Sequence, residues 1–295
     1  MEKTRLTSDC LSCIINMQMD KVPDNCSEEM RMIYKQRVCK VLSEAKRFES
    51  APLLIKRISD IQEELFGVSA DYSKIKRFYN DYVMKIMSKL EVKIKLADDP
   101  LFCAIQYSLT GNYIDFGAMK TVDQQQFDKL LADATKVRLD ESVYGRLRQE
   151  LCEAKTLVFL TDNCGEIVFD QMLIRRIKEL NPKLRITVVV RGKPVLNDAT
   201  YEDAEQIGLS KEVQVIGNGT NVAGTSLNMI GSAAAKAIAA ADVLIAKGQG
   251  NFETLQGCGL NIYYLFMCKC EMFARRFHVE RYSGLLINEQ QLSKS

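Results

Sequence analysis

Near the middle of the chain the sequence reads Leu157-Val158-Phe159-Leu160-Thr161-Asp162-Asn163-Cys164-Gly165-Glu166. The apolar residues predict a short buried strand, and the spacing from Ile167 onward predicts a helix. Asp, Asn and Gly also favour plain turns, so the stretch alone is compatible with an ordinary connection between a strand and a helix. In open α/β sheets, ligands bind outside the carboxyl ends of the strands, which makes Asp162 and Asn163 candidate site residues.

The second half of the chain repeats this alternation of strand and helix. Further apolar or β-branched runs occur at 185–190, 213–216, 242–246 and 261–267, and an Ala-rich helix is predicted over 226–241. Strands that alternate with helices predict an α/β fold, here a Rossmann-like, mostly parallel sheet with helices on both faces. We therefore expect an α/β domain over residues 151–295.

The first half of the chain is predicted to be helical. Helix starts are indicated by Ser27 followed by acidic residues, by Pro52 and by Pro100, and a long amphipathic stretch follows Asp71. No alternating strand pattern of useful length occurs there. The expectation is an all-helical domain over residues 1–150.

Composition narrows the class of protein. The chain has 295 residues, of which 47% are hydrophobic and 26% charged, as is typical of a globular protein. A formal net charge of +2 gives no argument for a nucleic-acid or membrane partner. No apolar run is long enough for a membrane span, and the first residues lack the apolar core of a signal peptide. We expect a cytoplasmic protein; the sequence does not predict its oligomeric state.

Histidine and cysteine limit the chemistry further. His278 is the single histidine, which argues against a Ser-His-Asp triad and against a His-rich zinc site. Among ten cysteines, Cys10 and Cys13 have the spacing of a metal or redox pair, with Cys26 and Cys39 as conceivable partners. Two thiols three residues apart also share one helix face, so simple burial in a core is the favoured explanation of the pair.

Polar side chains follow several of the predicted strands. Asp198 lies after the second strand, and its oxygens, with those of Asp162 and Asn163, would suit a hard divalent ion such as Mg²⁺ or Mn²⁺. Positive charge for an anionic group is offered by Arg191, Lys193 and Lys247. Because parallel strands end at one edge of their sheet, we expect these loops to converge on one cleft.

The residue types are those that phosphoryl transfer needs, since charge on the phosphoryl oxygens must be neutralised. Backbone N–H groups at Gly248 and Gly250 could hold a phosphate. Glu166 could orient a metal-bound water, although an acid in a first helical turn also has a structural explanation. A nicotinamide site is not indicated, because the Gly-x-Gly-x-x-Gly pattern after the first strand is missing, and no Walker motif occurs.

Three motifs in order resemble the metal-dependent damage-control phosphatases, first grouped as domain of unknown function 89. They are Asp162-Asn163-Cys164-Gly165-Glu166, Arg191-Gly192-Lys193-Pro194 with Asn197-Asp198-Ala199-Thr200, and Lys247-Gly248-Gln249-Gly250-Asn251-Phe252-Glu253-Thr254-Leu255. The early Cys10-x-x-Cys13 and the Gly111-Asn112-x-x-Asp115 element are similar to the prokaryotic branch. The resemblance covers nearly the whole chain.

The resemblance implies an enzyme that hydrolyses phosphate monoesters of small metabolites with Mn²⁺, Ni²⁺, Co²⁺ or Mg²⁺. Carried over by motif, it places metal ligands at Asp162, Asn163 and Asp198. It implies phosphate contacts at Lys247 and Arg191. The loops themselves offer Lys193, Gly248, Gly250 and Asn251 as further candidate phosphate or substrate contacts, and the helical half offers Asn112 and Asp115.

Two mechanisms stay open within this class. Water activated at the metal can attack, with Asp162, Glu166 and Lys247 as catalytic residues, or Asp162 can form an aspartyl-phosphate. The alternatives outside the class are an S-adenosylmethionine-dependent protein carboxyl methyltransferase and a non-catalytic protein that binds phosphometabolites.

Overall fold

The computed structural model describes residues 6–46, 48–67, 71–115 and 123–292. The helices of the first half are α1 (Ser8–Met19), α2 (Glu28–Ser43), α3 (Ala51–Phe66), α4 (Ser73–Lys95), α5 (Pro100–Gly111), α6 (Gln124–Ala132) and α7 (Glu141–Glu153). Those of the second half are α8 (Glu166–Leu180), α9 (Tyr201–Gln206), α10 (Ser232–Ala239), α11 (Gly248–Leu255), α12 (Glu271–Phe277) and α13 (Glu289–Leu292).

The sheet contains β1 (Thr156–Leu160), β2 (Arg185–Val190), β3 (Gln214–Gly217), β4 (Val243–Lys247), β5 (Ile262–Met267) and β6 (Gly284–Asn288). Its order is β3-β2-β1-β4-β5-β6, and every pair is parallel except β5 with β6. The predicted Rossmann-like, mostly parallel α/β fold is confirmed. The strand order reverses beside β1, and ligands bind at such a switch point in open α/β sheets.

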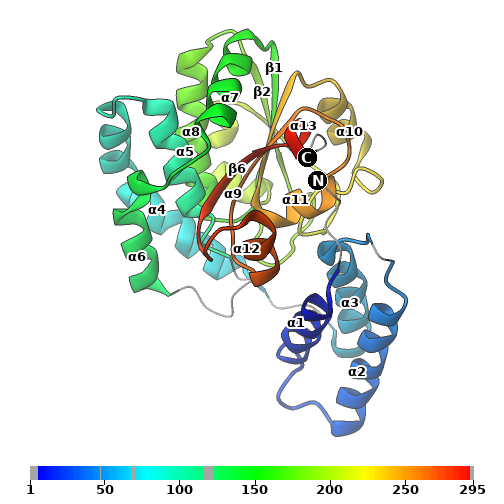
Figure 1. The fold of residues 1–295 in the computed structure, drawn as a ribbon. Helices are drawn as coiled ribbons and strands as arrows, with labels where there is room; N and C mark the ends of the chain where they lie inside the picture. The colour runs from blue at the N-terminus through cyan, green and yellow to red at the C-terminus, as the bar shows by residue number, and fades with distance from the viewer. Residues whose placement is uncertain (1–5, 47, 68–70, 116–122, 293–295) are drawn as a thin grey trace.

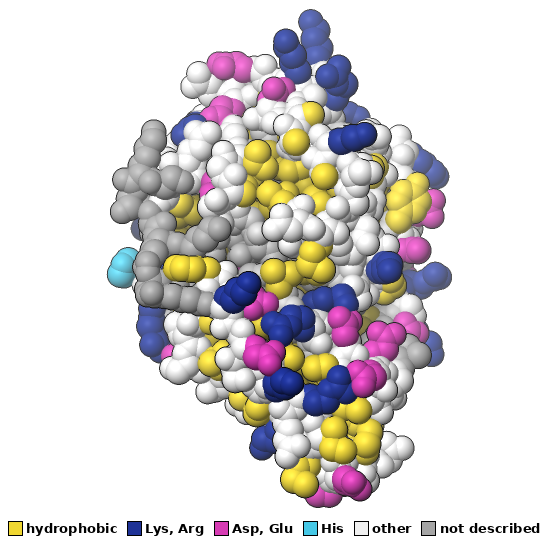
Figure 2. Space-filling view, turned by 90° about the vertical axis from the view of Figure 1, so that its right-hand side faces the viewer, with side chains coloured by type: hydrophobic (Ala, Val, Ile, Leu, Met, Phe, Trp, Pro, Cys, Tyr) yellow, Lys and Arg dark blue, Asp and Glu magenta, His cyan; other side chains and the backbone are white. Residues whose placement is uncertain are grey.

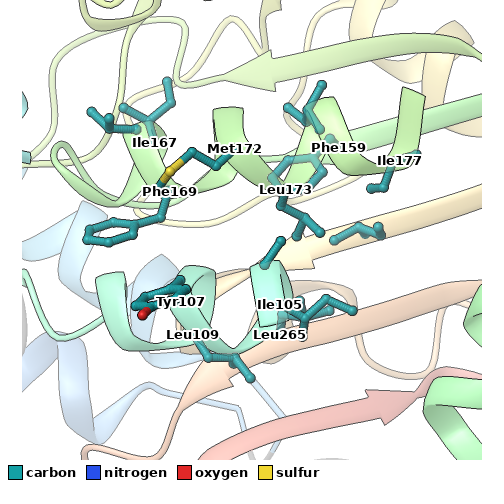
Figure 3. Close-up of a cluster of buried hydrophobic side chains, with 14 of the residues drawn as sticks. Ile105, Tyr107, Leu109, Phe159, Ile167, Phe169, Met172, Leu173, Ile177 and Leu265 are labelled. Carbon is teal, nitrogen blue, oxygen red and sulfur yellow. The ribbon is translucent and has the colours of Figure 1, made fainter. Parts of the chain in front are cut away.

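Alternate residues of each central strand face opposite layers of helices. Phe159 of β1 packs with α5 and α8 on one face, whereas Leu160 packs with Phe252 of α11 on the other. Figure 3 shows the first of these layers, where Tyr107 of α5 and Leu173 of α8 lie in one apolar cluster. Burial on both faces explains why these strands are continuously apolar.

The helices of the first half divide between two hydrophobic clusters. Helices α4, α5 and α7 contribute to the cluster on the sheet, through residues such as Val83, Ile105 and Leu147. Helices α1–α3 have a cluster of their own, which includes Tyr34 and Leu54. Figure 1 shows these three helices as a separate lobe at one end of the molecule. The division of the chain at residue 150 stays a prediction.

Two details of the predicted elements were wrong. The Ala-rich helix begins at Ser232 rather than at residue 226, because Ser226 accepts hydrogen bonds from Met229 and Ile230 in a turn that precedes it. The antiparallel strand β6 was not predicted from the sequence, since its five residues show no alternation that separates a strand from a loop. Within the described part of the chain, no helix has both the length and the apolar character needed to cross a membrane.

Candidate active site

The turn between β1 and α8 forms the base of the site. It carries Asp162 and Asn163 at the carboxyl end of β1, and α8 begins at Glu166. Gly165 has a φ of 69°, and a Cβ built there would lie 2.8 Å from Cδ1 of Ile114. Glycine is therefore required both by the left-handed backbone and by the close packing of this turn.

A second segment, after β2, is joined to this turn through its backbone. Asn163 and Asp198 form an isolated antiparallel bridge. The N–H of Ala199 donates to the carbonyl of Asp162 at 2.7 Å, and the N–H of Cys164 donates to the carbonyl of Asn197 at 2.8 Å. Main-chain pairing thus brings together the three oxygen-bearing side chains that the sequence indicated as metal ligands.

Arg191 connects the two carboxylates of this group. Its Nε donates to Oδ2 of Asp198 at 2.6 Å, and its NH2 donates to Oδ1 of Asp162 at 3.2 Å. Arg191 is only 2% exposed, so these contacts are largely shielded from solvent. A guanidinium with several fixed donors is suited to holding two acids in one orientation.

Side-chain amides complete the hydrogen bonding of the acids. Nδ2 of Asn112, at the end of α5, donates to Oδ2 of Asp162 at 3.1 Å and to Oε2 of Glu166 at 2.8 Å. Nδ2 of Asn163 donates to the same two oxygens at 2.8 and 3.0 Å. Asn112, predicted only as a loop residue or a possible contributor, therefore lies directly at the site.

Lys247 lies beneath the site rather than on its surface. Its Nζ donates to Oε1 of Glu166 at 2.6 Å, to Oδ1 of Asp170 at 3.0 Å and to the carbonyl of Ser108 at 3.1 Å. These contacts use all three protons of the ammonium group. Burial lowers the pKa of Lys247, but the two carboxylates outweigh it and the pKa is raised. The direct phosphate contact predicted for this lysine stays a prediction.

The residues after Lys247 form the start of α11. Gly248 has a φ of 80°, and a Cβ there would lie 1.9 Å from Oδ2 of Asp162. At Gly250 a Cβ would lie 2.2 Å from the carbonyl oxygen of Ala223. Both glycines permit close approaches that no other residue allows, and Gly248 places the Asp162 carboxylate against the N-terminus of the helix.

Asn251 is buried and anchors the start of α11. Its Nδ2 donates to the carbonyl of Thr161 at 3.0 Å and to that of Lys247 at 2.7 Å. Its Oδ1 accepts from the hydroxyl of Thr225 at 2.8 Å. These contacts connect the ends of β1 and β4 with the loop after β3. The predicted substrate contact of Asn251 has not been tested.

Lys193 and Asp115 lie in different surroundings. Lys193 is exposed in the loop after β2. Asp115 is half-buried and accepts a 2.6 Å ion-paired hydrogen bond from Nζ of Lys269. Burial is the main cause of the raised pKa values of Asp162 and Asp198, and the charge of Asp115 adds to both, so Asp115 lies within electrostatic reach of the site.

Lys269 is a candidate site residue that was not predicted from the sequence. It is 7% exposed, and its backbone N–H donates to Oε1 of Gln249 at 2.7 Å. Lys269 follows β5 at the same edge of the sheet as the other polar loops. The position after the fifth predicted strand was therefore a signal that could have been used.

The site holds more carboxylates than cationic side chains. Arg191 and Lys247 are in contact with the carboxylates of Asp162, Glu166, Asp170 and Asp198. Burial, followed by the charges of Asp198 and Glu166, raises the pKa of Asp162 well above its usual range. Burial also raises the pKa of Asp198 to about 6 and that of Asp170 to about 7. The site is thus short of positive charge.

The donor set fits a hard divalent ion. Two carboxylates and an amide are oxygen donors of the kind that Mg²⁺ and Mn²⁺ prefer. Across residues 6–46, 48–67, 71–115 and 123–292, no three His, Cys, Asp or Glu side chains gather as a metal site by themselves. The assignment of Asp162, Asn163 and Asp198 as the metal ligands stays a prediction.

Comparisons with known proteins show the family of the chain. The family described as "Damage-control phosphatase ARMT1-like domain" matches residues 6–285. The chain belongs to this family.

Similar proteins and structures extend the finding. A damage-control phosphatase from Pyrococcus horikoshii is 30% identical over 92% of the chain and 94% of its own length. A damage-control phosphatase from Archaeoglobus fulgidus is 33% identical over 78% of the chain and 81% of its own length. The crystal structure of a DUF89 family protein from Pyrococcus horikoshii is 27% identical, with a TM-score of 0.80 over 97% of this chain and 99% of that one.

The resemblance to damage-control phosphatases that the motifs indicated is thus confirmed, while the role of Cys10 and Cys13 stays open. Cys13 is exposed and Cys10 half-buried. The thiol of Cys13 lies 3.8 Å from the sulfur of Met17, and that of Cys10 accepts a hydrogen bond from Thr7. In the described residues, no third potential ligand joins the pair to make a metal site.

Proposed function

We propose that this member of the damage-control phosphatase family hydrolyses phosphate monoesters of small metabolites with the help of a divalent metal. The observation that carries the proposal is the backbone bridge between Asn163 and Asp198, which assembles the oxygen donors from two separate segments. The names of the two similar phosphatases support the reaction class.

Asp162, Asn163 and Asp198 would hold the metal. When bound, a divalent ion polarises a phosphoryl oxygen and makes a bound water a better nucleophile. Arg191 keeps both carboxylates oriented and stabilises their negative charge. Arg191 is also proposed to contact the phosphate. Its guanidinium bonds two of the proposed metal ligands, so it lies beside the place where a metal-bound phosphate would be held.

Glu166 is proposed to orient the attacking water and take up its proton. Its Oε1 is held by Lys247, and its Oε2 accepts from Asn112 and Asn163. These donors fix the carboxylate beside the proposed metal ligands. Lys247 accordingly acts on the reaction through Glu166.

Two further lysines are proposed to offer positive charge to a phosphorylated substrate. They are the exposed Lys193 and the buried Lys269.

A covalent route through Asp162 remains the second candidate mechanism. One carboxylate oxygen of Asp162 accepts from Arg191 and the other from two amides, so the group is oriented as a nucleophile would need to be. Rapid quenching during turnover separates the two routes. A phosphorylated peptide that contains Asp162 is expected only for the covalent route.

The alternatives from other classes are less well supported. Family membership and the names of similar proteins favour a phosphatase over a carboxyl methyltransferase. A non-catalytic binder of phosphometabolites would gain little from a surplus of buried carboxylates, since these repel a phosphate unless a cation lies between them. The cytoplasmic location stays a prediction.

The proposal is tested by measuring phosphate release from a panel of sugar phosphates and nucleotides with Mn²⁺, Ni²⁺, Co²⁺ or Mg²⁺. We expect metal-dependent activity that EDTA abolishes and that falls at least about 100-fold in Asp198→Asn, because a charged ligand is lost. Lys236→Met, a change of an exposed lysine on α10, is the matched control. Unchanged activity in Asp162→Ala, with metal present, would contradict both mechanisms.

A further inference from the structure

One buried side chain of α4 contacts both segments that build the proposed metal site. Asn80 is 0% exposed. Its Oδ1 accepts from the N–H of Gly165 at 2.6 Å, in the turn that carries Asp162 and Asn163. Its Nδ2 donates to Oδ1 of Asp203 at 2.9 Å, on the helix that follows Asp198. The two bonds use opposite ends of one amide.

Asn80 provides the side-chain acceptor for the turn at Gly165. Helix α8 has no side-chain cap at its N-terminus, where Gly165 is the capping residue. The neighbouring N–H of Cys164 is held by the carbonyl of Asn197, and the N–H of Asn163 by Glu166 at 3.2 Å. Asn80 supplies the acceptor for the remaining N–H, so it completes the fixation of the turn.

Asp203, the partner of the Asn80 Nδ2, is itself held in place by several contacts. Asp203 caps α9 through the N–H and hydroxyl of Thr200, both at 2.8 Å. Lys76, one turn before Asn80 on α4, contacts the same carboxylate at 2.6 Å and the Thr200 hydroxyl at 3.1 Å. Residues four apart lie on one helix face, so α4 presents Lys76 and Asn80 together.

We infer that Asn80 is a positioning residue that, together with the backbone bridge between Asn163 and Asp198, fixes the placement of Asp162–Asn163 relative to Asp198 and thereby tunes the affinity for the metal. The inference rests on the proposed function, because it concerns the same oxygen donors. A rigid amide that spans two ligand-bearing segments acts like the outer hydrogen-bond partners of metal ligands, which orient them without touching the ion.

The experiment compares Mn²⁺ binding by calorimetry and the electron paramagnetic resonance spectrum of bound Mn²⁺ in wild type and variants. Asn80→Ala is expected to weaken Mn²⁺ binding about 10- to 100-fold and to alter the spectrum. Asn80→Asp preserves the acceptor for Gly165 but places a carboxylate against Asp203, so its affinity is expected to fall as well. It provides the second variant if Asn80→Ala does not fold.

Gln206→Ala is the matched control. Gln206 accepts from Asn80 at 2.9 Å and donates to Asp81 at 2.8 Å, so its loss weakens the contact between α4 and α9 without removing the bond to Gly165. We expect wild-type Mn²⁺ affinity in this variant. If Gln206→Ala weakens binding as much as Asn80→Ala does, general packing of the helices accounts for the effect and the inference is wrong.

The outcomes also separate this inference from the proposed function. Wild-type protein that binds no divalent ion would overturn both. Wild-type binding with equal affinity and an unchanged spectrum in the folded Asn80 variants would overturn the positioning role alone. A weaker affinity and a changed spectrum in those variants, with normal binding in Gln206→Ala, would establish it.

Discussion

Charged side chains behave differently in the α1–α3 lobe and at the strand ends. In the lobe, Arg37 makes a bidentate pair with Glu64 at 2.7 and 2.8 Å, but both lie at the surface. At the strand ends, Lys247 makes similarly short contacts while fully buried. Because water screens the first pair and not the second, similar distances have very different energetic consequences.

The described part of the surface in Figure 2, unlike the buried site, carries no concentration of one charge. On the face in Figure 2, basic and acidic side chains are intermixed, in keeping with the small net charge. The narrow lower end of that view is the α1–α3 lobe, where Met32 is exposed. The lobe thus resembles an ordinary small helical bundle, whereas the unusual chemistry of the molecule is confined to its interior.

Helix α11 connects the two regions. Its first residues lie against Asp162, and its Glu253 accepts a hydrogen bond from the N–H of Ala51, the first residue of α3, at 3.2 Å. Ser50, the capping residue of α3, makes no side-chain cap of its own. A carboxylate of the α/β part therefore caps a helix of the lobe.

The largest expected effect comes from removing the buried cation. Lys247→Met would leave Glu166 and Asp170 without their shared partner, and one oxygen of Asp170 already has no hydrogen bond. We expect a loss of about 3–5 kcal/mol in the free energy of unfolding, measured with urea. The exposed Lys236→Met is the control and should be neutral. A loss below about 1 kcal/mol would show that the buried network is not needed for folding.

An intermediate effect is expected at the contact between the regions, and it should depend on pH. Burial raises the pKa of Glu253 from 4.5 to about 7, against the opposing effects of the Ala51 N–H and of Arg276. The folded state therefore binds this proton more tightly. The contribution of Glu253 to stability is complete below about pH 4.5 and is lost as the pH rises through about 7.

Glu253→Gln preserves an acceptor and cannot ionise. At pH 8 we expect the variant to be about 1–3 kcal/mol more stable than wild type, and at pH 4.5 the two should be equal. Urea unfolding at the two pH values measures the difference. A variant that is less stable at pH 8 would mean that the contacts with Ala51 and Arg276 outweigh the cost of burying the charge.

The smallest effect is expected in the lobe. Arg37→Ala removes an exposed ion pair with good geometry, and we expect no measurable change in urea unfolding at physiological salt. The comparison between the two regions would fail if this variant and Lys247→Met destabilised the protein to a similar degree.

The sequence predicted the site best where a residue directly follows a strand. Asp162 and Asn163 directly follow β1 and Asp198 lies in the loop after β2, so they became candidates for one site because parallel strands end at one edge of their sheet. The fold class could be predicted for a related reason: the spacing of apolar residues along the chain depends on local structure, and strands and helices differ in it.

Partners that come from distant helices could not be predicted. Asp170 and Asn80 lie within ordinary amphipathic helices, and nothing in their spacing shows that one faces Lys247 and the other Gly165. Such pairings depend on how α4 and α8 pack on the sheet, which is a property of tertiary contacts. Lys269 is intermediate between these two cases. Its position after a strand could be read from the sequence, but its ion pair with Asp115 could not.

The contact between Gly248 and Asp162 has a consequence for laboratory evolution of this enzyme. A carboxylate oxygen occupies the place where every other amino acid would carry its Cβ atom. Position 248 should therefore reject all substitutions in a mutational scan, even conservative ones, while the exposed Lys236 on α10 should accept many. Variants with new substrate preference should accumulate in the exposed loop after β2 and leave the start of α11 unchanged.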